Sequence, residues 1–192
     1  MNTPAAIQVK NLLPIEFCQF FTHVLLRNST EPNSAGDEQV PNCLSIMDHE
    51  VMFETVLERI WPAVESVVKE ELIPTYSYAR LYSNGDTLES HTDRPACEIS
   101  LTVQLGRSHH YAWPIYVNGQ RFDLAEGDAV LYQGCEVPHW REQCVGPEGY
   151  YSGQVFFHFV RKNGPHANEA GDSTKRNPPS FVKNRTVAME AK

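Results

Sequence analysis

Two histidines and one aspartate have the types and spacing of a metal site. His91 and Asp93 are separated by one residue, so in a β-strand their side chains point to the same face. His139 follows another strand-like run, Ala129 to Tyr132. If the two strands are neighbours, two imidazoles and one carboxylate meet in the arrangement that binds Fe(II) and leaves coordination positions open. The alternative is that these histidines are structural and bind no metal.

The segments that must position these residues begin with a mainly helical part, up to about residue 72. Pro14 is suited to the first turn of a helix, and apolar residues then recur at helical spacing. A second amphipathic pattern runs from Phe53 to Val68. Pro62 lies inside it, so we expect a kink or two shorter helices there.

From about residue 76 to 160 the pattern changes to short runs rich in Tyr, Val, Ile and Phe, separated by turn sequences. This pattern favours an antiparallel sandwich or barrel over a parallel sheet. Residues 113–131 should form a hairpin around Asn118-Gly119 that continues through Gly127-Asp128 into another strand. We therefore expect one domain over residues 1–162, with a helical part at about 12–72 and a β core at about 76–160.

The residues from 163 to 192 are rich in Pro, Asn, Lys and Ser, and we expect an extended or disordered tail. The net charge of the chain is −8, although the last 32 residues contain seven basic and three acidic residues. The acidic body argues against a core that binds nucleic acid, because phosphate contacts need a basic face.

Composition and cysteine usage indicate an ordinary globular protein. Hydrophobic residues make up 41% of the 192 residues and charged residues 21%. The five cysteines are odd in number and contain no CxxC pair, so we expect reduced thiols. No apolar run approaches the roughly 20 residues of a membrane helix, and the N-terminus lacks the features of a secretory signal. These features predict a cytoplasmic protein with no membrane partner.

Residues 78–160 resemble the core of the Fe(II)- and 2-oxoglutarate-dependent dioxygenases, and the prolyl-hydroxylase-like branch in particular. The matching features occur in the family's order, and they are Tyr82-Ser83-Asn84-Gly85, His91-Thr92-Asp93, the run 98–105, the run 126–132, His139 and the run 154–160. The two helical segments also resemble those that buttress the family's barrel. The resemblance covers less than half of the chain.

The resemblance implies a mainly β (α+β) protein with a double-stranded β-helix, or jelly-roll, core and N-terminal buttressing helices. It also implies that His91, Asp93 and His139 bind Fe(II), that 2-oxoglutarate is the cosubstrate, and that ascorbate can serve as a reductant. The expected reaction is hydroxylation of an unactivated C–H bond with release of succinate and CO2. Asp93 favours this outcome, since the halogenases of the superfamily carry a small residue in its place.

The residue that anchors the distal carboxylate of 2-oxoglutarate departs from the family pattern. Most members use Arg or Lys on the strand after the second histidine, but residues 150–155 contain neither. A buried carboxylate needs a cationic or multiply hydrogen-bonding partner. Arg141 is the best candidate, because it lies two residues beyond His139 and shares its face if the strand continues. Tyr82 matches a family tyrosine that hydrogen-bonds the cosubstrate.

Two further arginines are candidate substrate contacts. Arg80 shares the face of Tyr82, where it would bind an acidic group of the substrate or pair with a neighbouring Glu. Arg94 follows Asp93 and would reach the substrate mouth or hold the Asp93 carboxylate. The substrate itself, whether a small molecule, a peptide or a protein side chain, is not encoded in these motifs.

Two other functions remain open at this point. A cupin-like metalloprotein would use a similar sheet architecture without 2-oxoglutarate, and the missing strand Arg or Lys keeps that alternative open, although the chain has no His-x-His motif. A non-enzymatic jelly-roll binding module would hold a closed structural metal or none.

Overall fold

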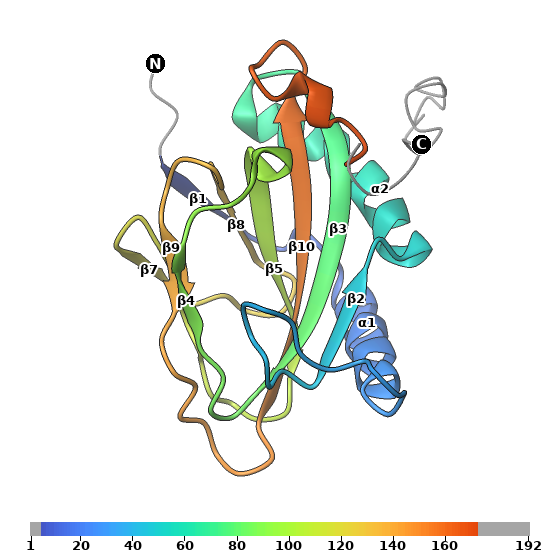
Figure 1. Cartoon of the computed structure of the whole chain (residues 1–192), viewed down its shortest axis with the longest axis vertical. Coiled ribbons are helices and arrows are strands. Elements are labelled where there is room, and N and C mark those ends of the chain that lie inside the picture. Colours follow the sequence, from blue (N-terminus) through green and yellow to red (C-terminus); the bar gives the residue numbers. More distant parts are fainter. Residues whose placement is uncertain (1–4, 173–192) are drawn as a thin grey trace.

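The computed structural model describes residues 5–172, which form two antiparallel β-sheets with two helices on one side (Figure 1). The larger sheet has the order β1-β8-β5-β10-β3-β2 and the smaller sheet has the order β4-β9-β6-β7. The strands of the larger sheet are β1 (Ala6–Val9), β2 (Ser45–Asp48), β3 (Leu72–Ser83), β5 (Ile99–Arg107), β8 (Ala129–Tyr132) and β10 (Tyr151–Arg161). Those of the smaller sheet are β4 (Leu88–His91), β6 (Ile115–Val117), β7 (Gln120–Phe122) and β9 (His139–Arg141).

The two helices, α1 (Ile15–Asn28) and α2 (Val51–Val68), cover the outer face of the larger sheet (Figure 1). Their apolar faces pack against the outward-facing residues of the sheet, such as Ala79 and Leu81 of β3, in the main core. None of the helices among residues 5–172 is both long enough and apolar enough to span a bilayer.

The break into two shorter helices expected at Pro62 is wrong, because α2 is one helix of 18 residues that contains this proline. Pro62 lies on the exposed face of the helix, while Ile60 and Val64 on either side of it are buried against the sheet. A proline inside a helix costs about 3 kcal/mol. Burial of the apolar residues on both sides of it offsets that cost.

The central strands β3 and β10 are longer than the sequence pattern predicts, and β10 extends past the expected run 154–160 at both ends. β3 begins at Leu72, four residues before the expected start, because its first residues pair with the end of β10 through Leu72 and Arg161. Strand alternation places Tyr76, Tyr78, Arg80 and Tyr82 on the face opposite Ala79 and Leu81. This inner face looks toward the smaller sheet.

The hairpin expected around Asn118-Gly119 is confirmed, since β6 and β7 pair across it. Both turn residues have positive φ angles, 50° and 76°, as a two-residue type I′ turn requires. The expected continuation through Gly127-Asp128 into a strand, β8, is also confirmed.

The first ten residues of the expected tail differ from an extended segment. Residues 163–172 contain a short 3₁₀ helix, Ala167–Glu169, and end at Asp172, whose side chain is fully buried. Residues 173–192, the rest of the expected tail, lie outside the described residues.

Candidate metal centre

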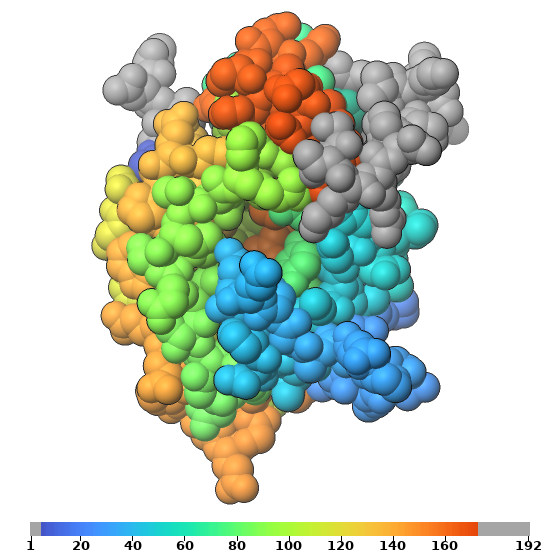
Figure 2. Space-filling model, viewed as in Figure 1, coloured from blue at the N-terminus to red at the C-terminus, as the bar shows by residue number. Residues whose placement is uncertain are grey.

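A cavity of about 460 Å³ lies between the two sheets, and it is lined by side chains of β3, β4, β5, β9 and β10. Its lining includes His91, Asp93 and His139 together with Arg80 and Arg94. Figure 2 shows a hollow in the surface between residues of the β4 region, in green, and the loop after α1, in blue. The cavity therefore has an entrance from solvent.

The structure brings the three candidate metal ligands together. His91 and His139 are directly paired across β4 and β9, and their ring centroids are 4.2 Å apart. Asp93 Oδ1 lies 3.6 Å from His91 Nε2 and 3.4 Å from His139 Nε2. Donor atoms that bind one ion at about 2.1 Å are about 3.0 to 3.4 Å apart. These spacings therefore suit a single metal ion.

Backbone carbonyls fix which nitrogen of each imidazole faces the centre. His91 Nδ1 donates to Glu89 O at 2.8 Å, and His139 Nδ1 donates to Val137 O at 3.1 Å. Burial lowers the pKa of His91, so this imidazole is neutral near pH 7 and its Nε2 carries a lone pair. An outer hydrogen bond of this kind is the usual way in which a protein orients a metal-binding histidine.

Asp93 is held by contacts that the sequence analysis did not identify. Ser100 Oγ donates to Asp93 Oδ2 at 3.1 Å and lies 3.0 Å from His158 Nδ1, so the three side chains form a chain of hydrogen bonds. Burial would raise the pKa of Asp93, but its interactions with His139 and with the nearby His158 and His91 outweigh it and hold the pKa below its usual value. His158 also lines the cavity.

Gly134 makes room for the Asp93 carboxylate. A Cβ atom at this position would lie 2.4 Å from Asp93 Oδ2, 2.4 Å from Cys97 O and 2.6 Å from Ser100 Oγ. The Gly134 carbonyl also accepts a hydrogen bond from the Asp93 N–H at 2.8 Å. This role is visible only in the folded structure, because Gly134 is 41 residues away from Asp93 in the sequence.

Arg141 lies deep in the barrel on the same face of β9 as His139, as strand alternation predicts. Its side chain is 1% exposed, and Nη1 donates to Trp113 O at 2.6 Å. Nε has no hydrogen-bond partner, and no carboxylate of residues 5–172 forms a salt bridge with this guanidinium. Burial lowers the pKa of Arg141 from its ordinary value. The ring of Tyr82 is 6.0 Å from the guanidinium carbon.

Arg80 lines the cavity, but its partner is an aspartate and not the expected Glu. Arg80 Nη2 donates to Asp37 Oδ2, and Nη1 donates to the Tyr82 hydroxyl at 2.9 Å. Asp37 belongs to the loop between α1 and β2 and also accepts a hydrogen bond from the Tyr78 hydroxyl at 2.5 Å.

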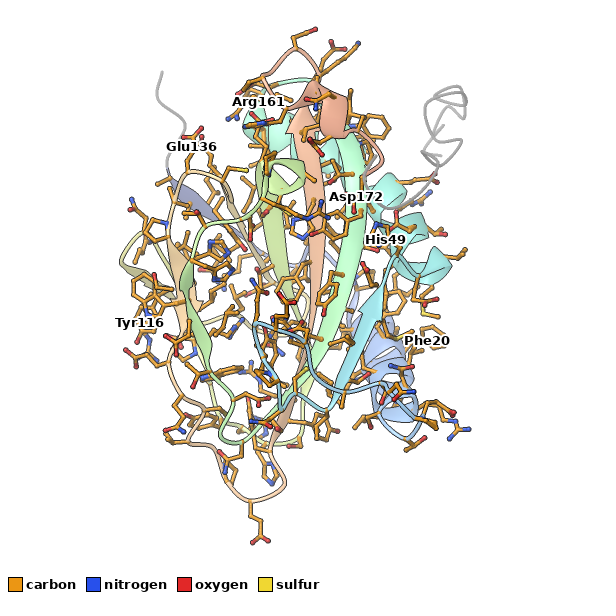
Figure 3. The ribbon with its side chains drawn as sticks, viewed as in Figure 1. Phe20, His49, Tyr116, Glu136, Arg161 and Asp172 are labelled. Atoms are coloured by element: carbon orange, nitrogen blue, oxygen red, sulfur yellow. The ribbon has the colours of Figure 1, made fainter. Side chains whose placement is uncertain are left out.

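Arg94 also lines the cavity, and it does not hold the Asp93 carboxylate. Its two terminal nitrogens donate to the two oxygens of Asp172, each at 2.7 Å, and its guanidinium lies over the Tyr76 ring at 4.5 Å. His49 Nε2 is 3.1 Å from the same carboxylate, and Figure 3 shows His49 and Asp172 close together alongside β3. Arg94 thus joins the metal-site loop to residues 163–172.

Comparisons with solved structures identify the fold. A prolyl-4-hydroxylase from Pseudomonas putida has a TM-score of 0.62 at 15% identity, with 83% of this chain and 94% of that chain covered. HygX from Streptomyces hygroscopicus, crystallised with nickel, 2-oxoglutarate and hygromycin B, has a TM-score of 0.64 at 13% identity, with 84% of each chain covered. A viral collagen prolyl hydroxylase from Paramecium Bursaria Chlorella virus-1, in complex with 2-oxoglutarate, has a TM-score of 0.60 at 9% identity, with 81% and 95% covered.

No family model matches the chain, and no curated protein matches it by sequence. At these identities the structural likeness establishes the fold, which is the double-stranded β-helix of the 2-oxoglutarate- and Fe(II)-dependent oxygenases. The expected fold class is therefore confirmed.

Proposed function

We propose that this protein is an Fe(II)- and 2-oxoglutarate-dependent oxygenase that hydroxylates an unactivated C–H bond of its substrate. His91, Asp93 and His139 are the proposed ligands of the metal, and Arg80 and Arg94, which line the cavity, are the proposed contacts of the substrate. Tyr82 and Arg141, which are buried and are not among the lining residues of the cavity, are the proposed contacts of 2-oxoglutarate. When bound, the iron and 2-oxoglutarate supply the activation of O2, with succinate and CO2 as the coproducts.

The observation that carries this proposal is the convergence of three electron-pair donors on one point. The Nδ1–H groups of His91 and His139 donate hydrogen bonds to backbone carbonyls, so both Nε2 atoms are left to face Asp93 Oδ1. Such atoms repel one another unless a cation or an added proton lies between them. The cavity beside them leaves space for further ligands, as a reactive site needs and a closed structural site does not.

Arg141 supports the choice of 2-oxoglutarate as the cosubstrate. Residues two apart in a strand are separated by about 6.8 Å. The Cα atoms of His139 and Arg141 are thus separated along β9 by about the length of a five-carbon dicarboxylate, and the two side chains share one face of the strand. A buried guanidinium without a carboxylate partner among residues 5–172 is suited to bind one from a ligand. Nothing comparable favours the cupin-like alternative or the non-enzymatic binding module.

The remaining residues hold and shield the reactants. Ser100 and His158 keep the Asp93 carboxylate oriented, and Thr102, Tyr132 and Ile115 form the part of the lining that belongs to the barrel interior. The cavity is large enough for a small molecule or for one side chain of a peptide or protein, which are the proposed substrate classes. The five free cysteines support a reducing compartment, and we propose the cytoplasm.

Asp93→Ala tests this proposal. The variant should lose Fe(II) binding, and succinate formation from 2-oxoglutarate should fall at least about a hundredfold, because one of three metal ligands is removed. Asp123→Ala, which removes an exposed carboxylate of the same chain, is the matched control and should leave both unchanged. If the unaltered protein binds the metal but consumes no 2-oxoglutarate, the result would favour the cupin-like alternative.

A further inference from the structure

Arg80 is a buried cation in the wall of the cavity, and its carboxylate partner comes from a loop. The Arg80 residue is 2% exposed, and the rings of Tyr78 and Phe156 lie 5.2 Å and 5.9 Å from its guanidinium carbon. Its salt bridge to Asp37 joins β3 to the loop between α1 and β2. This loop borders the hollow that Figure 2 shows, so the pair lies where a substrate would enter.

The pairing between Arg80 and Asp37 leaves part of the guanidinium unused. Of the guanidinium nitrogens, only Nη2 donates to Asp37 Oδ2, which also accepts from the Tyr78 hydroxyl, and Nη2 lies 3.3 Å from Gln39 Oε1. Asp37 Oδ1 accepts hydrogen bonds from the backbone N–H groups of Gln39 and Val40. Arg80 Nε is buried and has no hydrogen-bond partner among the described residues. A carboxylate that is free of the loop can bind Nε and Nη2 together, side-on, which is the stronger geometry for an arginine.

The second cation of the cavity is not available in the same way. Both terminal nitrogens of Arg94 are engaged by Asp172, whose side chain is fully buried. The Asp37 side chain, by contrast, is 21% exposed, so it can leave its position toward solvent. Arg80 is therefore the guanidinium of the cavity whose partner can be exchanged.

We propose that Arg80 binds a carboxylate group of the substrate, and that Asp37 occupies this position only while the substrate is absent. The inference rests on the proposed function and narrows its substrate to a carboxylate-bearing molecule. Binding of the substrate carboxylate releases Asp37, and with it the segment Ala35–Gln39, from the side of the cavity. The rings of Tyr78 and Phe156, which pack against each other beside the guanidinium, stay in contact with it while the partner changes.

Two matched variants separate this exchange from a general effect of charge. Asp37→Asn and Glu38→Gln each remove one negative charge from the same loop, but Asp37 contacts Arg80 and Glu38 has no such contact. The probes are hippurate, in which a glycine carboxylate is joined through an amide to an aromatic ring, and its neutral amide, hippuramide. Binding is measured by calorimetry on the anaerobic protein loaded with Fe(II) and saturated with 2-oxoglutarate, and again on the metal-free protein.

We expect hippurate to bind about tenfold more tightly to Asp37→Asn than to the unaltered protein, since its internal competitor is gone. Glu38→Gln should change the affinity less than twofold, and hippuramide should not distinguish the three proteins. Arg80→Met should remove the preference for hippurate over hippuramide. Arg80→Lys, which keeps the charge without the planar fork, should keep part of that preference and serves if the Met variant does not fold.

Equal gains in hippurate affinity in Asp37→Asn and Glu38→Gln would overturn the inference, because the loss of one negative charge would then explain both gains. Equal binding of hippurate and hippuramide to Asp37→Asn would overturn it as well. The visible absorption of the Fe(II)–2-oxoglutarate complex is recorded before each probe is added. Absence of this absorption band contradicts the proposed function. The comparison of hippurate with hippuramide on the metal-free protein still decides whether Arg80 binds a carboxylate.

Discussion

Arg141→Met should separate the stability of the protein from its affinity for 2-oxoglutarate. The guanidinium is 1% exposed, has an unpartnered Nε and keeps one hydrogen bond, to Trp113 O at 2.6 Å. Methionine removes that bond together with a buried charge that has no carboxylate partner among residues 5–172. These two effects oppose each other, so the free energy of unfolding of the ligand-free protein should fall by less than about 1 kcal/mol or rise.

The affinity for 2-oxoglutarate should fall by about a hundredfold. A hydrogen bond to a charged group contributes about 1.5 to 3 kcal/mol, and two bonds to one carboxylate, each at the lower end of this range, give about 3 kcal/mol. Each 1.4 kcal/mol changes Kd about tenfold. At a 2-oxoglutarate concentration of about 100 times the Kd of the unaltered protein, the ligand adds about 2.7 kcal/mol to stability. The variant should gain only about 0.4 kcal/mol at this concentration.

Denaturant unfolding of the anaerobic Fe(II)-loaded protein, with and without 2-oxoglutarate, measures both quantities. Arg121→Met is the matched control, because Arg121 lies in the same sheet but is exposed and pairs with Asp123. If 2-oxoglutarate stabilised Arg141→Met by the full gain of about 2.7 kcal/mol expected of the unaltered protein, the reasoning would be refuted, because another residue would then bind the distal carboxylate.

Two further predictions concern the support of the site and of the sheet. Gly134→Ala should reduce Fe(II) affinity at least about tenfold, because a Cβ 2.4 Å from Asp93 Oδ2 must displace that carboxylate. The secondary-structure content measured by circular dichroism should not change. An unchanged Fe(II) affinity would contradict the contact between residue 134 and the Asp93 carboxylate. Asp128→Asn should destabilise the protein by about 1 kcal/mol at pH 7, because the carboxylate accepts hydrogen bonds from Lys10 and from the N–H groups of Asn11 and Ala125. Burial would raise the pKa of Asp128, but these bonds outweigh it and hold the pKa below its ordinary value of 3.8, so the stabilisation is present above that value and lost as the pH falls through the lower, folded-state pKa. Denaturant unfolding at pH 7 and pH 3 should therefore show a smaller difference between the two proteins at pH 3, and a difference that grows at low pH would contradict this sign.

The positions on strands could be predicted from the sequence because alternation is local. His139 and Arg141 share a face of β9 through spacing alone, and β4 and β9 needed only to be neighbours to bring His91 beside His139. Asp93 follows the end of β4, so strand alternation alone does not place it. The continuous helix through Pro62 could not be predicted in the same way. It depends on burial against a sheet whose strands are distant in sequence.

The supporting contacts could not be predicted because they join segments that meet only in the folded chain. Gly134 and Ser100 approach Asp93 from two different parts of the chain, and no local pattern marks either residue. The carboxylate partners of Arg80 and Arg94 are likewise remote, since Asp37 precedes Arg80 by 43 residues and Asp172 follows Arg94 by 78. A basic residue near a metal-binding motif therefore indicates a possible anion contact, but its resident partner has to come from the structure.

The most direct measurement of the central claim is an anaerobic titration of the metal-free protein with Fe(II) and then with 2-oxoglutarate, followed by visible absorption. We expect a weak charge-transfer band once both are present, and we expect His139→Ala to lose it, because His139 is one of the three converging ligands. Iron binding without the band in the unaltered protein would contradict the account, since the site would then hold a metal but lack a working 2-oxoglutarate pocket.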